Sequence, residues 1–241
     1  MKTIPALFRN SVELFGDNPL MYQYGKQGYE PLSYRGMDVL VKQFANGLLA
    51  LGLQKTDKVT LISEGRNDWV MAELAVVSAG GINVPVSVRV DEPEDLAFRI
   101  NHSESVMVIV SGRHAHKVIS LDDRIPGVRH IILLDETAQQ DSRIVNREKV
   151  LELGEKFAVD HPGLLERISS EVQEDDIANI CYTSGTTADP KGILLTHKNY
   201  FVNVEQAGGL FEIPPYFTSV LILPWDHSFA HTAGIYALMK N

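Results

Sequence analysis

Apolar and polar residues follow two different periods along this chain, and the changes of period predict its helices and strands. Apolar positions recur every three to four residues over ranges such as 4–15, which is typical of an amphipathic helix. Short, wholly apolar runs such as Val106–Val110 indicate strands that are covered on both faces of a sheet. The predicted helices are 4–15, 33–51, 69–79, 94–102, 114–121, 145–157, 163–169, 197–210 and 232–239. The predicted strands are 20–24, 29–32, 58–63, 82–86, 106–110, 130–134, 177–182, 193–195 and 220–223.

From residue 58 onward the predicted strands alternate with predicted helices. That alternation indicates an α/β fold with a layered, mixed and mostly parallel sheet that carries helices on both faces. Local residues mark some of the ends. Ser33 and Thr196 are suitable helix N-caps, and Gly52 is a suitable C-terminal stop for the long helix before it. Residues 25–28 predict a four-residue hairpin turn between two short strands.

Composition narrows the class of protein. The chain has 241 residues, of which 44% are hydrophobic and 22% are charged, as in an ordinary globular protein with an ample core. A net charge of -9 gives no general attraction to nucleic acid or membranes. The single Cys181 cannot form an internal disulfide, which fits a reducing, cytoplasmic location, and its apolar neighbours indicate a core position. The most apolar stretch, 74–88, is too interrupted to span a bilayer, and residues 1–18 lack a signal-peptide pattern.

Residues 183–192, Thr-Ser-Gly-Thr-Thr-Ala-Asp-Pro-Lys-Gly, form a polar loop between two predicted strands. Glycines and small side chains let backbone N–H groups approach an anion, and Lys191 adds a positive charge. The serine and threonine hydroxyls can donate to phosphate oxygens or bind a magnesium ion. The sequence therefore predicts a phosphate-binding loop.

This loop differs from the P-loop of nucleoside triphosphatases, in which Gly-Lys-Ser/Thr opens a helix. Here Pro190 precedes Lys191, Gly192 follows it, and an apolar run comes next. The simple alternative is a hairpin turn without a ligand, but the density of phosphate-compatible residues between two strands favours phosphate. A dinucleotide-dependent oxidoreductase is disfavoured because no Gly-x-Gly-x-x-Gly follows the early strands.

A second polar and aromatic cluster, Leu-Pro-Trp-Asp-His-Ser-Phe at 223–229, follows the apolar run predicted as a strand at 220–223. Ligands bind at the carboxyl ends of strands in α/β sheets, so this cluster is a candidate site. His227 and His231 lie four residues apart, so they would lie on the same face if this segment were helical. A metal pair is disfavoured, because Ser228 stands where the zinc motif needs Glu and no third ligand is evident. From these residues alone, a structural histidine is an equal alternative for His227.

The loop at 183–192 closely resembles the phosphate-loop signature of the adenylate-forming, AMP-binding synthetases, which include acyl-CoA synthetases, luciferases and peptide-synthetase adenylation domains. The Leu-Pro-aromatic segment with His227 resembles that family's second signature. Looser similarity begins near Leu32, and Asp-Trp at 68–69 with Asn-Val-Pro at 83–85 is most similar to the long-chain fatty acyl-CoA synthetase branch. One departure is Ala188, where the family usually has glycine; alanine is strained there if the position needs a positive φ.

The resemblance implies a two-step reaction. A carboxylic acid reacts with ATP and Mg²⁺ to give an acyl-adenylate and pyrophosphate, and the acyl group then passes to the thiol of coenzyme A. It implies that Lys191 and His227 are catalytic, the first beside the phosphates and the second beside the substrate carboxylate. The implied phosphate-binding residues are Thr183, Ser184, Gly185, Thr186, Thr187 and Lys191, and the implied acyl-pocket residues are Trp225, His227, Ser228 and Phe229.

Enzymes of this family are more than twice as long as the chain, and their adenine, ribose and lid segments have no match here. We therefore expect residues 1–241 to be the N-terminal part of the large domain, inactive alone, with the lid and most of the coenzyme A site outside it. Residues 33–223 would form the main α/β subdomain, and 224–241 would begin the next. Alternatives are an aryl-CoA ligase, an amino-acid adenylation enzyme, or a non-catalytic nucleotide-phosphate-binding module. The expected partner is a small carboxylic acid, and an open sheet edge would favour oligomers.

Overall fold

The main sheet runs through the centre of the molecule and is mostly parallel. A computed structural model describes residues 2–136, 142–183, 190–210, 214 and 217–240. Within this part seven strands form one sheet in the order β7-β6-β5-β3-β4-β8-β9. All neighbours are parallel except β8 and β9, which are antiparallel. The bounds are β3 Lys58–Ile62, β4 Ile82–Pro85, β5 Ser105–Val110, β6 His130–Leu133, β7 Ile144–Asn146, β8 Ile177–Thr183 and β9 Lys191–Thr196.

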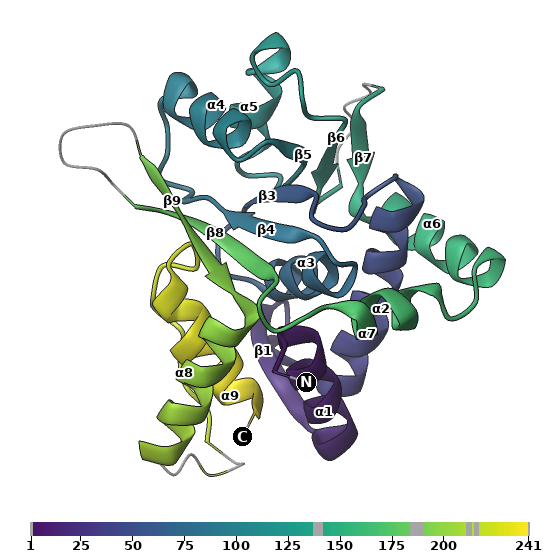
Figure 1. Cartoon of the computed structure of the whole chain (residues 1–241), viewed down its shortest axis with the longest axis vertical. Coiled ribbons are helices and arrows are strands. Elements are labelled where there is room, and N and C mark those ends of the chain that lie inside the picture. Colours follow the sequence, from purple (N-terminus) through teal and green to yellow (C-terminus); the bar gives the residue numbers. More distant parts are fainter. Residues whose placement is uncertain (1, 137–141, 184–189, 211–213, 215–216, 241) are drawn as a thin grey trace.

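Helices cover both faces of the sheet, as the sequence predicts. Strand β5 shows why, because successive side chains of a strand point to opposite faces. Met107 and Ile109 pack into one core cluster, whereas Val108 and Val110 pack into a second. Figure 1 shows the helices of the two layers on either side of the sheet. The first cluster includes α1 Ile4–Phe15, α2 Tyr34–Ala50, α3 Asn67–Ser78 and α6 Arg147–Asp160, and the second includes α4 Pro93–His102 and α5 Ala115–Ile119. The predicted α/β fold is confirmed.

Capping residues mark both ends of the long helix α2 where the sequence indicates. The hydroxyl of Ser33 accepts a hydrogen bond from the Gly36 N–H at 3.0 Å, as an N-cap should. Past the other end, Gly52 has φ +88°, a conformation that glycine adopts without strain. The N–H of Leu53 donates to the carbonyl of Leu48, which completes a Schellman-type stop.

Two predictions need correction in detail. The hairpin of β1 Pro19–Gly25 and β2 Gly28–Ser33 pairs Gly25 with Gly28, so its turn has two residues instead of four. A short edge strand, β7, occupies the start of the range predicted as a helix at 145–157, and α6 begins only at Arg147. Three residues are too few to show a strand period in sequence; their pairing with β6 makes the strand.

The apolar run at 220–223 is not a strand, contrary to the prediction. Its residues have no regular secondary structure, and the side chains of Val220 and Ile222 are 80% and 85% exposed. A strand needs a neighbour to bond with, and in the described part of the chain the sheet ends at β9. The argument that His227 follows a strand end therefore does not hold.

Helices α8 and α9 lie in the lower part of the molecule in Figure 1, close to the N-terminal helix α1. The predicted helix at 232–239 exists, but it begins earlier as a π-helix. The bounds are α7 Leu164–Glu171, α8 His197–Leu210, the π-helix η2 Ala230–Tyr236 and α9 Ala237–Lys240, with a single 3₁₀ turn, η1, at Asp122–Arg124. No helix within the described ranges combines the length and the apolar character needed to cross a bilayer.

Candidate functional site

Strands β8 and β9 hold the predicted phosphate loop between their ends. The two strands pair antiparallel, and Thr183 lies directly opposite Lys191 in the ladder. Both residues are exposed at the open end of this hairpin. The predicted phosphate-binding residues Ser184, Gly185, Thr186 and Thr187, together with Ala188, lie outside the described residues. The structure thus places both ends of the loop and leaves its roles as predictions.

Lys191 differs from Lys198, seven residues later in the chain, in its ion pairing. The ammonium group of Lys198 lies 2.9 Å from a carboxylate oxygen of Glu174. Among the residues that the structure describes, Lys191 has no carboxylate within ion-pair distance. An unpaired, exposed ammonium at the mouth of a Ser-, Gly- and Thr-rich loop can attract an anion locally, although the chain as a whole is acidic.

The second predicted cluster forms a tight turn that leads into a helix. The N–H of His227 donates to the carbonyl of Pro224 at 3.1 Å, which closes a four-residue turn around Trp225. Nδ1 of His227 accepts from the N–H of Phe229 at 3.1 Å, so Nε2 is the ring nitrogen left for another partner. His227 and Phe229 are exposed, whereas Ser228 and Trp225 are half-buried.

The structure therefore gathers Trp225, His227, Ser228 and Phe229 into one turn, and Thr183 and Lys191 into one hairpin end. No hydrogen bond, ion pair or ring contact between described residues joins the two groups. A site that uses both would be bridged by a ligand or by residues outside the described ranges.

Behind the turn lies a buried polar cluster that the sequence did not reveal. Glu73 on α3 and His231 on η2 are both fully buried, and Glu73 Oε1 lies 3.1 Å from His231 Nδ1. Asn179 on β8 donates to the same carboxylate oxygen at 3.2 Å, and the ring of Tyr200 stacks on His231. One signal was present: Glu73 stands in a helix whose residues 69–78 are otherwise almost all apolar, so its charge needs a partner.

The charges of this pair follow from its geometry. Burial alone would raise the pKa of Glu73, but the charge and hydrogen bond of His231 hold that pKa below its ordinary value. Burial alone would lower the pKa of His231, but the Glu73 carboxylate raises it. Each group therefore favours the charged form of the other. His231 is engaged in this way, and no group of three or more His, Cys, Asp or Glu residues suitable for a metal ion occurs among the described residues.

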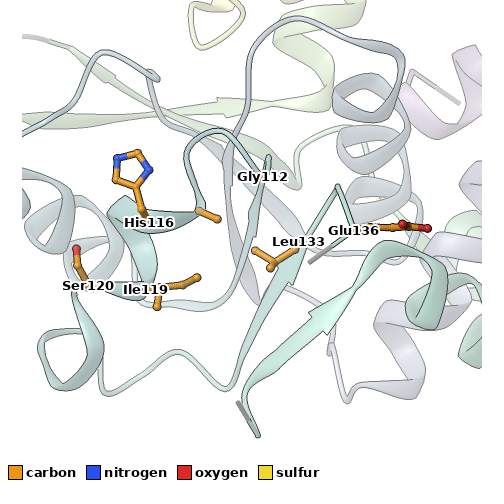
Figure 2. A pocket seen from close by; sticks show the side chains of 7 residues that line it. Gly112, His116, Ile119, Ser120, Leu133 and Glu136 are labelled. Carbon is orange, nitrogen blue, oxygen red and sulfur yellow. The ribbon is translucent and has the colours of Figure 1, made fainter. Parts of the chain in front are cut away.

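The Cys181 thiol is buried, and burial raises its pKa to about 12, which confirms the predicted core position and disfavours a nucleophile. A pocket of about 510 Å³ opens beside α5. Figure 2 shows His116, Ile119 and Ser120 of α5 and Leu133 of β6 around it. None of the predicted site residues lines this pocket.

Comparison with known proteins supports the resemblance across the chain. A family profile described as AMP-binding enzyme matches residues 8–241. The chain is 28% identical over 201 residues to a long-chain-fatty-acid–CoA ligase of Rattus norvegicus, and the match covers 82% of the chain and 29% of that protein. It is 33% identical over 174 residues to a medium/long-chain-fatty-acid–CoA/3-oxocholest-4-en-26-oate–CoA ligase of Mycobacterium tuberculosis, covering 72% and 30% of the two proteins.

A solved structure shares the fold at low sequence identity. The anthranilate CoA ligase AuaEII in complex with anthranoyl-AMP superposes with a TM-score of 0.83 at 18% identity, covering 99% of this chain and 43% of that one. At this identity the likeness shows the fold alone. The chain thus spans 29% and 30% of the length of the two curated relatives above, so it corresponds to one part of such enzymes.

Proposed function

This chain belongs to the AMP-binding enzyme family. We propose that it supplies two parts of the active site of a fatty acyl-CoA synthetase: the loop at 183–192, which binds the triphosphate of ATP, and the turn at 224–227, which faces the substrate carboxylate. In that reaction a carboxylate oxygen attacks the α-phosphorus of ATP, and the bond to the departing pyrophosphate breaks. The acyl-adenylate then transfers its acyl group to the thiol of coenzyme A and releases AMP. The fatty acid is favoured because fatty-acid ligases are among the similar curated proteins.

The observation that carries the proposal is the end of the β8–β9 hairpin. Lys191 sits opposite Thr183 and, among described residues, has no carboxylate partner, so its charge is available to the phosphates. Positive charge placed there before reaction stabilises the negative charge that grows on the leaving pyrophosphate. Loop hydroxyls and N–H groups at 184–187 would complete the phosphate contacts.

Magnesium fits this arrangement as an ion that arrives with the nucleotide. The described residues offer no cluster of carboxylates for it. Mg²⁺ is commonly held by substrate phosphates, waters and one or two protein oxygens, and a hydroxyl such as that of Thr183 could be one of them. Its chemistry would be to neutralise phosphate charge.

His227 is the group assigned to the substrate carboxylate. Its Nε2 is free of the turn's internal bonds, because Nδ1 already accepts from Phe229. An exposed imidazole N–H can hold one carboxylate oxygen and orient the other toward the α-phosphorus. Trp225, Ser228 and Phe229 would be its neighbours in the acyl pocket. We also assign residues 33–223 to the main subdomain and 224–241 to the start of the next, with most of the coenzyme A site outside this chain.

Carboxylate-dependent ATP–pyrophosphate exchange tests the proposal. It is measured on an enzyme that carries this chain at the length of its relatives, with a panel of fatty, aryl and amino acids. We expect exchange that depends on a fatty acid and falls by about 10²-fold or more in Lys191→Ala, the scale found when one charge-stabilising group is removed. The 241-residue chain alone is expected to bind ATP without turnover. Exchange with aryl or amino acids only would reassign the substrate, and exchange with no acid would refute the proposal.

A further inference from the structure

The buried ion pair of Glu73 and His231 is unusual because it serves no need of the core around it. Both side chains are fully buried, and the other residues of α3 between Trp69 and Val77 are apolar. Replacing a buried ion pair by apolar residues of similar size is often neutral or stabilising, so such a pair is weak support for a purely structural role. The cluster also leaves the side-chain amide oxygens of Asn83 and Asn179 without a partner in the described part of the chain.

The pair is connected to the candidate site through the second ring nitrogen of His231. Its Nε2 donates to the backbone carbonyl of Trp225 at 2.8 Å. Because Nδ1 faces Glu73, the carboxylate fixes both the orientation of the ring and its protonated form. The carbonyl of Trp225 is therefore held by a fully buried charged donor, the stronger class of hydrogen bond.

Trp225 is also held by its ring. Its indole packs edge-to-face on Trp69, with centroids 5.4 Å apart at 83°. The indole also lies so close to Gly65 that a Cβ added there would be 2.4 Å from the ring. Trp69 in turn lies 5.2 Å from the His231 ring. Backbone and ring of Trp225 are thus fixed from the same buried cluster.

The position of Trp225 sets the position of His227. Trp225 and Asp226 are the central residues of the turn that the His227 N–H closes onto Pro224. The carbonyl of His227 then accepts from the N–H of Ala230, one residue before His231. A displacement of His231 therefore acts on this turn from both ends.

We propose that His231, oriented by Glu73, is a positioning residue that fixes the Pro224–His227 turn and thereby aims His227 at the substrate carboxylate. The second half of this inference rests on the proposed function, in which His227 faces the carboxylate. The first half is a statement about the turn and can be tested without any substrate.

The first test uses the 241-residue chain labelled with 5-fluorotryptophan. The sequence has two tryptophans, so its fluorine NMR spectrum has two signals, which Trp225→Phe assigns. We expect His231→Gln and Glu73→Gln to shift or split the Trp225 signal. His197→Gln is the matched control, because His197 is also buried but its ring accepts from the N–H of Ile4 and is not bonded to Glu73 or Trp225, and it should leave that signal in place. An unmoved Trp225 signal in both cluster variants overturns the proposal.

Gly65→Ala covers the case in which the cluster variants do not fold. The added Cβ would collide with the Trp225 ring, and the substitution removes neither member of the ion pair. It should move the Trp225 signal as the cluster variants do. If the signal stays in place although the variant is folded, the turn is not held as we propose.

The second test uses exchange kinetics at the length of the relatives. His231→Gln and Gly65→Ala should lower kcat/KM for the acid by about 10²-fold, the cost of a small misplacement, with the KM for ATP little changed. Equal losses for acid and ATP, or none for the acid, overturn the positioning role. If the unmodified enzyme shows no exchange with any acid, the proposed function fails while the fluorine result still decides the anchoring.

Discussion

Two buried histidines on different helices have pKa values that their surroundings shift in opposite directions. His197 begins α8, where β9 meets the N-terminal helix α1, and is 2% exposed; His231 lies behind the candidate site and is 0% exposed. Burial lowers the pKa of His197 to about 4, and Asp176 offsets this only in part. At His231 the adjacent Glu73 carboxylate overcomes the same burial and raises the pKa. The partner, more than the burial, decides which form of the ring the fold keeps.

The two forms do different work. Neutral His197 uses Nδ1 as an acceptor for the N–H of Ile4 at 3.3 Å, and so ties the start of α1 to the end of the sheet. Charged His231 needs a proton on both nitrogens, one for Glu73 and one for the carbonyl of Trp225. The first region needs a histidine that stays neutral, and the second needs one that stays charged.

Removing Glu73 should have the largest effect on the free energy of unfolding. Glu73→Ala leaves His231 buried without a counter-charge, and breaking a buried pair in this way costs about 3–5 kcal/mol of unfolding free energy. Urea unfolding of the 241-residue chain measures it. Glu174→Ala, which removes an exposed partner of Lys198, is the control and should change little. Equal stability of the Glu73 variant and the control would show that the pair is not charged.

Lowering the pH should destabilise the fold through His197. The folded pKa of His197 lies at about 4, below the ordinary value of about 6.5, so the unfolded chain takes up a proton first as the pH falls. This contribution to stability is complete above pH 6.5 and is lost towards pH 4, by about 3 kcal/mol. At His231 the Glu73 carboxylate raises the folded pKa, so its contribution to stability has the opposite sign and is lost as the pH rises.

The measurement compares urea unfolding of the unmodified chain and His197→Gln between pH 7 and pH 4.5. Glutamine can still accept from Ile4 but does not titrate, so the variant should lose that part of the pH slope. Identical slopes would mean that His197 is protonated in the fold and that the contrast with His231 is wrong.

The smallest effect concerns the cap beside His197. The hydroxyl of Thr196 accepts from the N–H of Asn199 at 3.2 Å, and the Asn199 side chain accepts from the N–H of Thr196 at 2.9 Å. Thr196→Ala should cost about 1 kcal/mol, as for other N-caps. Thr196→Ser keeps the hydroxyl and should retain most of that stability, measured in the same urea assay. If serine is as damaging as alanine, the cap is not what stabilises this junction.

Local chemistry made much of the fold predictable. The caps at Ser33 and Thr196 and the stop at Gly52 act within a few residues of themselves, so the sequence places them well. The all-apolar run of β5 indicated two covered faces, and both are present. By contrast β7 exists only through its neighbour β6, and the run at 220–223 has strand-like composition without a neighbour. Pairing is decided by residues far away in the sequence.

The candidate site divides in the same way. Thr183, Lys191 and His227 stand in compact motifs, so they could be chosen as candidates from the sequence, and their roles stay predictions. The Glu73–His231 pair joins residues 158 positions apart, and only the fold brings them together. His231 was visible in the sequence merely as a histidine four residues after His227, in a spacing for which a metal pair was considered and disfavoured.

Calorimetric titration of the 241-residue chain with ATP and Mg²⁺ tests the central claim most directly, namely that the loop at 183–192 binds the triphosphate of ATP. We expect saturable binding that Lys191→Ala weakens by about tenfold or more, because a charge-assisted contact to phosphate is lost. Lys198→Ala is the matched control, since that lysine is already paired with Glu174, and it should bind as the unmodified chain does. Absence of binding, or equal binding by both lysine variants and the unmodified chain, would contradict the account.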